Sequence, residues 1–193
     1  VKAPMFSFHR LSGADPSLGV EMSSTGEVGC FGVHKEEAFL KAMLSTGATA
    51  PVVGSKILVS IESSLREEFT PTLRKLSVMG YELCATEETA GALQELGLEV
   101  THLHWPESGM QPNVDEAIRN KDLSMVMMFS NQLSVRRETN YAIRRLATDY
   151  NVPLITNLQV AEYFMNAIEA TRAGKPLEDL SLQEYWELDG NVP

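Results

Sequence analysis

Residues 56–85, KILVSIESSLREEFTPTLRKLSVMGYELCA, contain the pattern that decides the fold. Ile57 to Ile61 is a short apolar run of the kind found in strands that are buried on both faces. Phe69 to Met79 has apolar residues at helical spacing and ends at Gly80, and Tyr81 to Ala85 is strand-like again. A strand, a helix and a second strand in this order predict a right-handed βαβ unit with parallel strands.

The same alternation continues to about residue 172. Thr86 is a favourable N-cap for a helix that runs to about Leu96, with Gly97 after it. Further strands are predicted at 98–103, 124–129 and 152–155, and further helices at 114–120, 140–151 and 158–171. The pattern therefore predicts an α/β fold with a parallel sheet of about five strands and helices on both faces.

The first fifty residues lack the alternation of strands and helices that is predicted for residues 56–172. They contain turn-rich stretches, a strand-like segment at 18–22 and a helical pattern from Lys35 to Ser45. Residues 48–55, ATAPVVGS, are small residues with Pro and Gly and are typical of a linker. We predict a first segment at 1–47, a linker at 48–55, the α/β domain at 56–172 and a tail at 173–193. The start at Val1 suggests a piece of a longer chain.

Composition excludes several classes of protein. The formal net charge of −10 lacks the basic surface that a nucleic-acid partner requires. The sequence has no apolar run near the roughly 18 residues of a membrane helix, so no membrane partner is predicted. Cys30 and Cys84 are far apart and are expected to be reduced thiols. The four histidines form no helical HxxxH pair, so we predict no metal site.

Ligands of open α/β sheets bind at the carboxyl ends of the strands, and that rule selects a polar group of residues. The loops there contain neutral donors close to helix N-termini, which favour an anion. They contain no catalytic set and no Gly-rich phosphate loop. The selected residues are Thr86, Thr89, Trp105, Asn131 and Asn140, with Arg66 in the loop after the first strand. Purely structural roles are the alternative: Thr86 and Asn140 as N-caps, and Trp105 as cover for a core edge.

Two stretches resemble the large synthetase subunit of carbamoyl-phosphate synthetases. LGVEMSSTGEVGCFG (18–32) with AFLKAMLSTG (38–47) is similar to the end of the second ATP-grasp unit. CATEETAGAL (84–93), the Trp105–Pro106 pair and NYAIRRLATDYNVPLITNLQV (140–160) resemble the methylglyoxal-synthase-like allosteric domain, which has a flavodoxin-like fold. The resemblance covers about residues 1–172.

The resemblance implies a regulatory domain without catalytic residues of its own. The parent enzyme would make carbamoyl phosphate with ATP and Mg²⁺, and the fragment itself would need no cofactor. Of the regulatory types in the family, the one that requires N-acetyl-L-glutamate is the most similar, which implies mitochondrial localisation, with cytoplasmic as the alternative. The family's acetylglutamate pocket maps by motif onto Thr86, Thr89, Trp105, Asn131 and Asn140. The implied partners are this effector and the upstream synthetase domains.

Three alternatives stay open. The domain is of the nucleotide-regulated pyrimidine type that responds to UMP or UTP, or a free-standing methylglyoxal-synthase-like enzyme, or an interaction module with an empty crevice. The synthase's catalytic GGDQ-type loop is missing, because Phe129-Ser130-Asn131-Gln132 stands there. Met128 also departs from the acetylglutamate pattern, since the family usually has Asn at the end of this strand, and the loss removes one polar contact.

Overall fold

The computed structural model describes residues 1–17, 24–130, 136–174 and 177–188. The predicted strand at 18–22 and the predicted site residue Asn131 lie outside these ranges. The chain forms two compact units. The first unit comprises Val1–Phe6, Met22–Ala50 and Tyr163–Pro193, and the second comprises Ser7–Glu21 and Pro51–Glu162.

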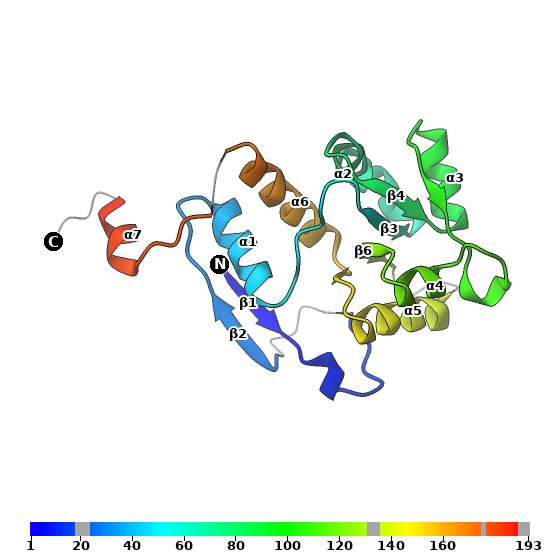
Figure 1. Cartoon of the computed structure of the whole chain (residues 1–193), viewed down its shortest axis with the longest axis horizontal. Helices are drawn as coiled ribbons and strands as arrows, with labels where there is room; N and C mark the ends of the chain where they lie inside the picture. Colours follow the sequence, from blue (N-terminus) through cyan, green and yellow to red (C-terminus); the bar gives the residue numbers. More distant parts are fainter. Residues whose placement is uncertain (18–23, 131–135, 175–176, 189–193) are drawn as a thin grey trace. The chain divides into compact units, whose positions relative to one another are not determined.

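The second unit contains the predicted parallel sheet, which is confirmed with five strands (Figure 1). Its order is β5-β4-β3-β6-β7, and every neighbouring pair is parallel. The strands are β3 (Lys56–Ile61), β4 (Glu82–Ala85), β5 (Thr101–His102), β6 (Leu123–Phe129) and β7 (Leu154–Ile155). The helices after them are α2 (Arg66–Val78), α3 (Glu87–Glu95), α4 (Val114–Arg119), α5 (Arg137–Asp149) and α6 (Leu158–Arg172), and α6 continues into the first unit.

The strand order reverses at the centre of the sheet. The chain moves outward from β3 through β4 to the edge strand β5, and then crosses back to β6 on the other side of β3. Connections therefore leave β3 and β6 in opposite directions, which opens a crevice at their carboxyl ends. The fold thus places a ligand site between the ends of β3 and β6.

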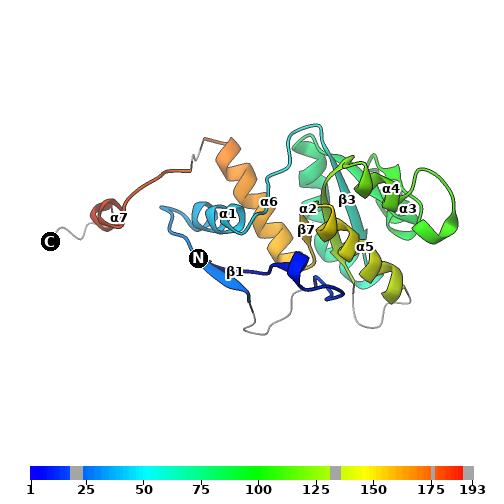
Figure 2. The same ribbon diagram turned by 60° about the horizontal axis from the view of Figure 1, so that its bottom comes forward.

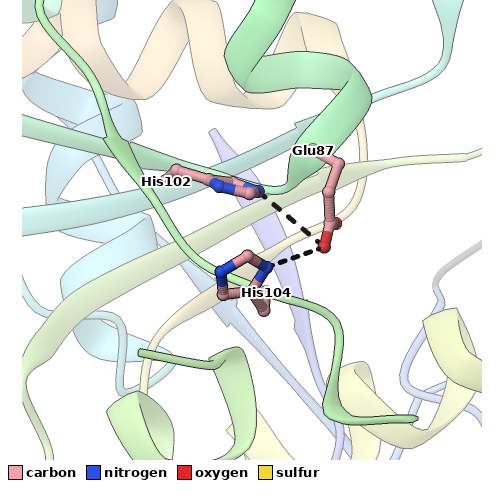
Figure 3. Close-up of side chains that lie close together, drawn as sticks. All are labelled: Glu87, His102 and His104. Atoms are coloured by element: carbon pink, nitrogen blue, oxygen red, sulfur yellow. Dashed lines mark hydrogen bonds and ion pairs between the residues drawn. The ribbon is translucent and has the colours of Figure 1, made fainter. Parts of the chain in front are cut away.

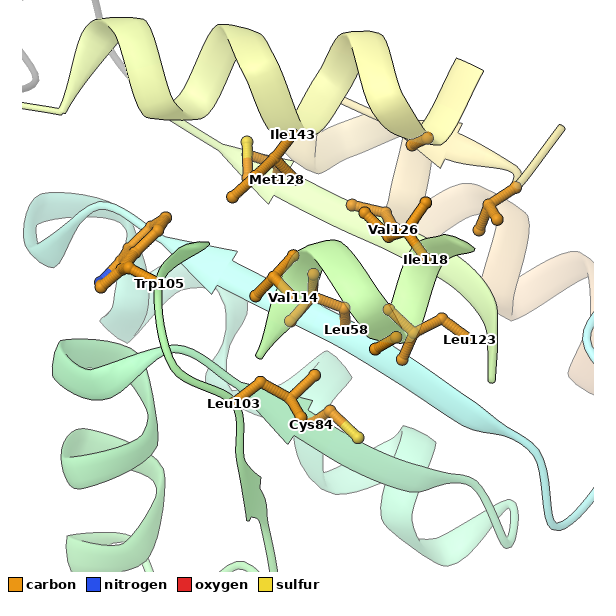
Figure 4. Packing of buried hydrophobic residues seen from close by; sticks show 13 residues of the cluster. Leu58, Cys84, Leu103, Trp105, Val114, Ile118, Leu123, Val126, Met128 and Ile143 are labelled. Carbon is orange, nitrogen blue, oxygen red and sulfur yellow. The ribbon is translucent and has the colours of Figure 1, made fainter. Parts of the chain in front are cut away.

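The central strands are buried on both faces, as their continuous apolar sequence predicted. Leu58, Val126 and Met128 face one apolar cluster, where they meet Ile143 of α5 and Ile118 of α4 (Figure 4). Side chains alternate along a strand, so the neighbours of Met128 point to the opposite face. There the Phe129 ring packs edge-on against Phe69 of α2, with ring centroids 4.8 Å apart. Burial also raises the pKa of the Cys84 thiol to about 11, which keeps it protonated at neutral pH.

Two helices begin earlier than predicted. α2 begins at Arg66 instead of Phe69, directly after the short 3₁₀ turn η2 (Ser63–Leu65). Glu67 and Glu68 then occupy the first turn, where a helix dipole favours acidic residues. α5 begins at Arg137, three residues before the predicted start. Asn140 is therefore a buried residue inside the first turn of α5 and does not cap the helix.

A segment before the sheet packs on α5 within the second unit (Figure 2). It contains the 3₁₀ turn η1 (Phe8–Arg10), and Arg145 donates hydrogen bonds to the carbonyls of Phe8, Leu11 and Ala14. Arg144 forms a two-pronged ion pair with Asp15, at 2.7 and 2.5 Å. Arg144 and Arg145 therefore hold this segment against α5 and are not a solvated helix face. Part of the predicted 1–47 segment thus belongs to the unit that contains the sheet.

The first unit is organised around one ion pair on α1 (Lys35–Ser45). Its antiparallel strands are β1 (Lys2–Met5) and β2 (Gly26–Gly29), and its last helix is α7 (Leu182–Leu188). Glu37 is buried and lies 2.6 Å from Lys41, whose ammonium also donates to the Tyr185 hydroxyl of α7 and to the Glu178 carbonyl. The Glu37 carboxylate accepts a further bond from the Glu178 amide. The tail that the sequence left without a role is therefore tied to α1. Within the described residues, no helix is long and apolar enough to cross a membrane.

Phe69→Ala tests the packing between α2 and β6. Phe69 is fully buried, so its removal is expected to lower the free energy of unfolding by about 3–5 kcal/mol. Urea unfolding followed by circular dichroism measures this change. Val78→Ala, on the same helix but 88% exposed, is the matched control and should change stability by less than about 0.5 kcal/mol. A loss below about 1 kcal/mol for Phe69→Ala would contradict this packing.

Candidate functional site

A cavity of about 680 Å³ lies at the carboxyl ends of the strands of the second unit. This volume falls within the range of about 300–1,000 Å³ that small-molecule sites occupy. β3 and β6 supply its centre, and the loops after β4 and β5 and the start of α5 supply its walls. The lining residues are Ser60, Ile61, Glu62, Thr86, Glu88, Thr89, Trp105, Glu107, Phe129, Ser130, Arg136, Arg137, Glu138, Thr139 and Asn140.

The deep part of the cavity is polar but uncharged. Thr86, Thr89, Trp105 and Asn140 are between 1% and 6% exposed, although each carries a polar group. Buried polar groups need hydrogen-bond partners, so such a floor favours a ligand with its own donors and acceptors. These are four of the six residues that the sequence selected, and the structure brings them to one cavity.

The two threonines differ in their bonding. Thr86 stands at the N-cap position of α3 with extended backbone, yet its side chain makes no capping hydrogen bond. Thr89, one turn later, accepts a hydrogen bond from the Ile61 amide through its Oγ1 at 3.1 Å. Thr89 thus joins α3 to the end of β3. Thr89 therefore helps to hold the wall of the cavity. Thr86 occupies the predicted N-cap position, but its hydroxyl does not cap the helix.

Trp105 has two unlike sides. Its ring belongs to the apolar cluster under α4 and α5, and in Figure 4 the nitrogen end of the indole points away from that cluster. Its Nε1 is buried and has no hydrogen-bond partner among the described residues. The Arg136 guanidinium lies 4.9 Å from the ring centroid, which is a cation–π distance. Trp105 therefore covers a core edge, as the structural alternative proposed, and also presents an unsatisfied donor beside a cation.

Charged residues surround this floor. Four glutamates (Glu62, Glu88, Glu107 and Glu138) outnumber two arginines among the lining residues. The Arg136 guanidinium pairs with the Glu107 carboxylate at 2.8 Å, and Thr139 donates to the same carboxylate oxygen. Arg136 and Glu107 are both more than 40% exposed, so this pair is loosely held and solvent-screened. The rim therefore has an exposed cation–anion pair whose arginine lies over the Trp105 ring.

Of the other two predicted site residues, Asn131 lies outside the described residues and Arg66 is arranged differently from the four in the cavity. Arg66 does not line the cavity; its Nε donates to the Ile61 carbonyl, and its Nη2 lies 3.9 Å from Glu88 at the rim. Met128 is 1% exposed in the apolar cluster, so the strand position that differs from the family points into the core. Arg136 was not among the predicted site residues, although it stands in the loop after the fourth strand, where the rule for strand ends places a ligand.

Arg144 connects the cavity with the segment that precedes the sheet. Arg144 is 7% exposed, and its guanidinium donates to the Ser130 hydroxyl at 3.3 Å and also pairs with Asp15. Ser130 is a lining residue at the end of β6. Arg144 thus links Ser130, at the cavity, to Asp15 in the 7–17 segment through a single side chain.

Comparison with known proteins agrees with this fold. Residues 68–156 match the MGS-like domain family. The chain is 40% identical over 187 residues to the multifunctional protein pyr1-3 of Dictyostelium discoideum, which covers 93% of this chain and 8% of that protein. It is 42% identical over 176 residues to the mitochondrial carbamoyl-phosphate synthase [ammonia] of Homo sapiens, and this match covers 89% of this chain and 12% of that protein. It is also 42% identical over 182 residues to the multifunctional protein pyr-3 of Neurospora crassa, covering 89% and 10%.

These relatives do not separate two regulatory types, because synthases named for ammonia and multifunctional proteins match equally well. The chain spans about a tenth of their length. A solved methylglyoxal synthase from Elizabethkingia anophelis also aligns, with a TM-score of 0.47 and 16% identity over 74% of this chain and 95% of that one. That likeness carries no argument about this chain.

The ion pair of Asp15 and Arg144 predicts a pH dependence of stability. Partial burial acts to raise the pKa of Asp15, but the hydrogen bond and charge of Arg144 outweigh it and hold the pKa below 3.8. A lowered folded-state pKa means that the stabilisation is present above about pH 4 and is lost as the pH falls further. Asp15→Asn should therefore lower stability at pH 7 and reduce the loss of stability below about pH 4, measured by urea unfolding. The exposed Asp122→Asn is the control, and an unchanged pH profile in Asp15→Asn would contradict the pair.

Proposed function

We propose that this chain is the part of a carbamoyl-phosphate synthase that contains the MGS-like domain, and that its crevice binds the allosteric effector N-acetyl-L-glutamate. One observation carries the proposal: a neutral polar floor with an unsatisfied indole donor lies at the point where the strand order reverses. The similarity to synthases supports the parent, and the ATxxT, WP and NYxIRR motifs support the effector.

The unpaired donor of Trp105 favours a ligand with a carboxylate or amide oxygen. An N–H group that is buried without an acceptor costs about 1–3 kcal/mol, and an acceptor oxygen from the ligand would remove that cost. N-Acetyl-L-glutamate has two carboxylates and one acetamide. One of these oxygens would accept from Trp105 Nε1, and a carboxylate would take Arg136 from its partner Glu107.

The charge of the rim favours this effector over a nucleotide triphosphate. Glutamates outnumber arginines among the described lining residues of the cavity. A triphosphate carries about four negative charges and would be repelled more strongly than a dicarboxylate. The runner-up is the nucleotide-regulated pyrimidine type, because the multifunctional proteins are equally similar.

The parent enzyme would make carbamoyl phosphate from bicarbonate, ATP and ammonia or glutamine, for arginine synthesis or the urea cycle. In this proposal the effector moves Ser130, and Arg144 passes the change through Asp15 to the segment that leads back to the synthetase part. Couplings of this kind amount to about 1–3 kcal/mol. The acetylglutamate type also implies a mitochondrial protein, and the human, mouse and rat relatives carry that word in their names.

Calorimetry of the 193-residue chain with N-acetyl-L-glutamate, UMP and UTP tests the proposal. We expect heat of binding with N-acetyl-L-glutamate and no heat of binding with UMP or UTP. Trp105→Phe retains most of the packing but loses one hydrogen bond, so affinity should fall about 2- to 12-fold. Arg136→Gln removes a charge and should weaken binding by about tenfold or more. Exposed Arg74→Gln on α2 is the matched control and should bind as the unmodified chain does.

Two outcomes would overturn the proposal. Binding of UMP or UTP without heat from N-acetyl-L-glutamate would assign the domain to the pyrimidine type. Equal affinity in Trp105→Phe, Arg136→Gln and the unmodified chain would remove the effector from this cavity.

A further inference from the structure

Three side chains of metal-ligating type meet at the edge of the sheet, beside the cavity (Figure 3). Glu87 is in the first turn of α3, His102 is on β5, and His104 follows two residues later. The Glu87 Oε1 atom lies 3.3 Å from His104 Nδ1 and 3.8 Å from His102 Nε2. The three ligand atoms all lie within 4.8 Å of one another.

The backbone explains why these residues converge. His102 and His104 are two positions apart on an extended chain, so their side chains share a face, and Leu103 between them points into the apolar cluster. The two imidazole rings lie 4.4 Å apart at the centroids, in a T-shaped arrangement. His104 is fixed further along, because its amide donates to the Pro112 carbonyl and its carbonyl accepts from the Val114 amide. Backbone hydrogen bonds thus hold this end of the face in place without a ligand.

Unsatisfied atoms indicate that something is missing from this group. Glu87 Oε2 and His102 Nε2 are both buried, and neither has a hydrogen-bond partner among the described residues. The other carboxylate oxygen, Oε1, accepts from the Trp105 amide at 3.3 Å, so one half of the carboxylate is satisfied and the other is not. A carboxylate oxygen that is shielded from water without a donor is costly. Oε1 also lies within hydrogen-bond distance of His104 Nδ1, at 3.3 Å. A cation bound by the Glu87 carboxylate and by His102 Nε2 would remove the cost of both unpartnered atoms.

We propose that Glu87, His102 and His104 bind one Zn²⁺ ion. Imidazole nitrogen and carboxylate oxygen are ligands that Zn²⁺ accepts, and three protein ligands with one open position form a recurrent zinc geometry. Zinc–ligand bonds of about 2.0–2.2 Å in a tetrahedron place the ligand atoms about 3.3 Å apart. The 3.3 Å between Glu87 Oε1 and His104 Nδ1 matches this value. The other two separations are longer, so His102 would have to move slightly toward the ion. His102 would coordinate through Nε2 and His104 through Nδ1.

A zinc ion here would be held by residues that are direct chain neighbours of cavity-lining residues. Glu87 lies between Thr86 and Glu88, which line the cavity, and Trp105 directly follows His104. The ion would tie the start of α3 to the segment that contains Trp105. Zinc binding does not require the proposed effector, so its measurement stands apart from the outcome for N-acetyl-L-glutamate.

The test is calorimetry of the chelator-treated 193-residue chain with ZnCl₂, without effector. One ion per chain is expected, and MgCl₂, which prefers oxygen ligands, should give no heat at this site. His104→Asn, His102→Asn and Glu87→Gln should each weaken zinc binding by about tenfold or more. Glu87→Gln retains an oxygen for the Trp105 amide, which protects the fold. Exposed His34→Asn and Glu95→Gln are the matched controls and should bind zinc as the unmodified chain does.

A second measurement uses CoCl₂ as a spectroscopic probe. Cobalt bound by two imidazoles, one carboxylate and water should show the visible absorption of a four-coordinate site, and Glu87→Gln should lose it. Circular dichroism checks that each variant is folded. No zinc heat would overturn the proposal and leave a histidine–glutamate hydrogen-bonded pair. Equal zinc affinity in the three site variants would also overturn it, because the ion would then be bound elsewhere.

Discussion

The parallel pairing of β3 with β6 is the constraint on which the rest of the second unit depends. Residues Ile57 to Ile61 pair in register with Met125 to Phe129, and both strands are buried on both faces. This pairing joins two parts of the chain that lie about seventy residues apart, and the intervening helices must return over the sheet to allow it. Because the chain leaves β3 and β6 in opposite directions, their ends stay open, and the cavity is a direct consequence.

The floor of the cavity and its rim follow different physical rules. The Trp105 ring packs in the apolar cluster and Asn140 is buried within α5, so both positions are defined without a ligand. Arg136 and Glu107 are exposed and paired with each other, and an exposed pair of this kind contributes at most about 1 kcal/mol. A carboxylate ligand can therefore exchange with Glu107 at little cost. This combination of a rigid neutral floor and a loose charged rim suits an effector that must bind reversibly.

Periodicity predicted the elements of the sheet well, because buried strands and amphipathic helices have distinct patterns. The rule for strand ends then brought Thr86, Thr89, Trp105 and Asn140 together correctly. Helix starts were less predictable: α5 begins three residues early, so that Arg136, a lining residue of the cavity, stands at its N-cap position. Sequence could not show that Arg144 is buried against Asp15, since that contact joins residues 129 positions apart. The sequence also gave no sign of the group formed by Glu87, His102 and His104. The two histidines are brought together by the two-residue spacing of a strand, and Glu87 comes from a neighbouring helix, so no helical histidine spacing marks the group.

The central claim is that a carboxylate effector completes the bonding of the buried Trp105 indole, and a crystal structure of the chain with N-acetyl-L-glutamate tests it most directly. The account predicts the ligand between the ends of β3 and β6, with one of its oxygens within about 3.2 Å of Trp105 Nε1. A ligand bound elsewhere, or an indole nitrogen that stays unpaired beside the bound ligand, would contradict it.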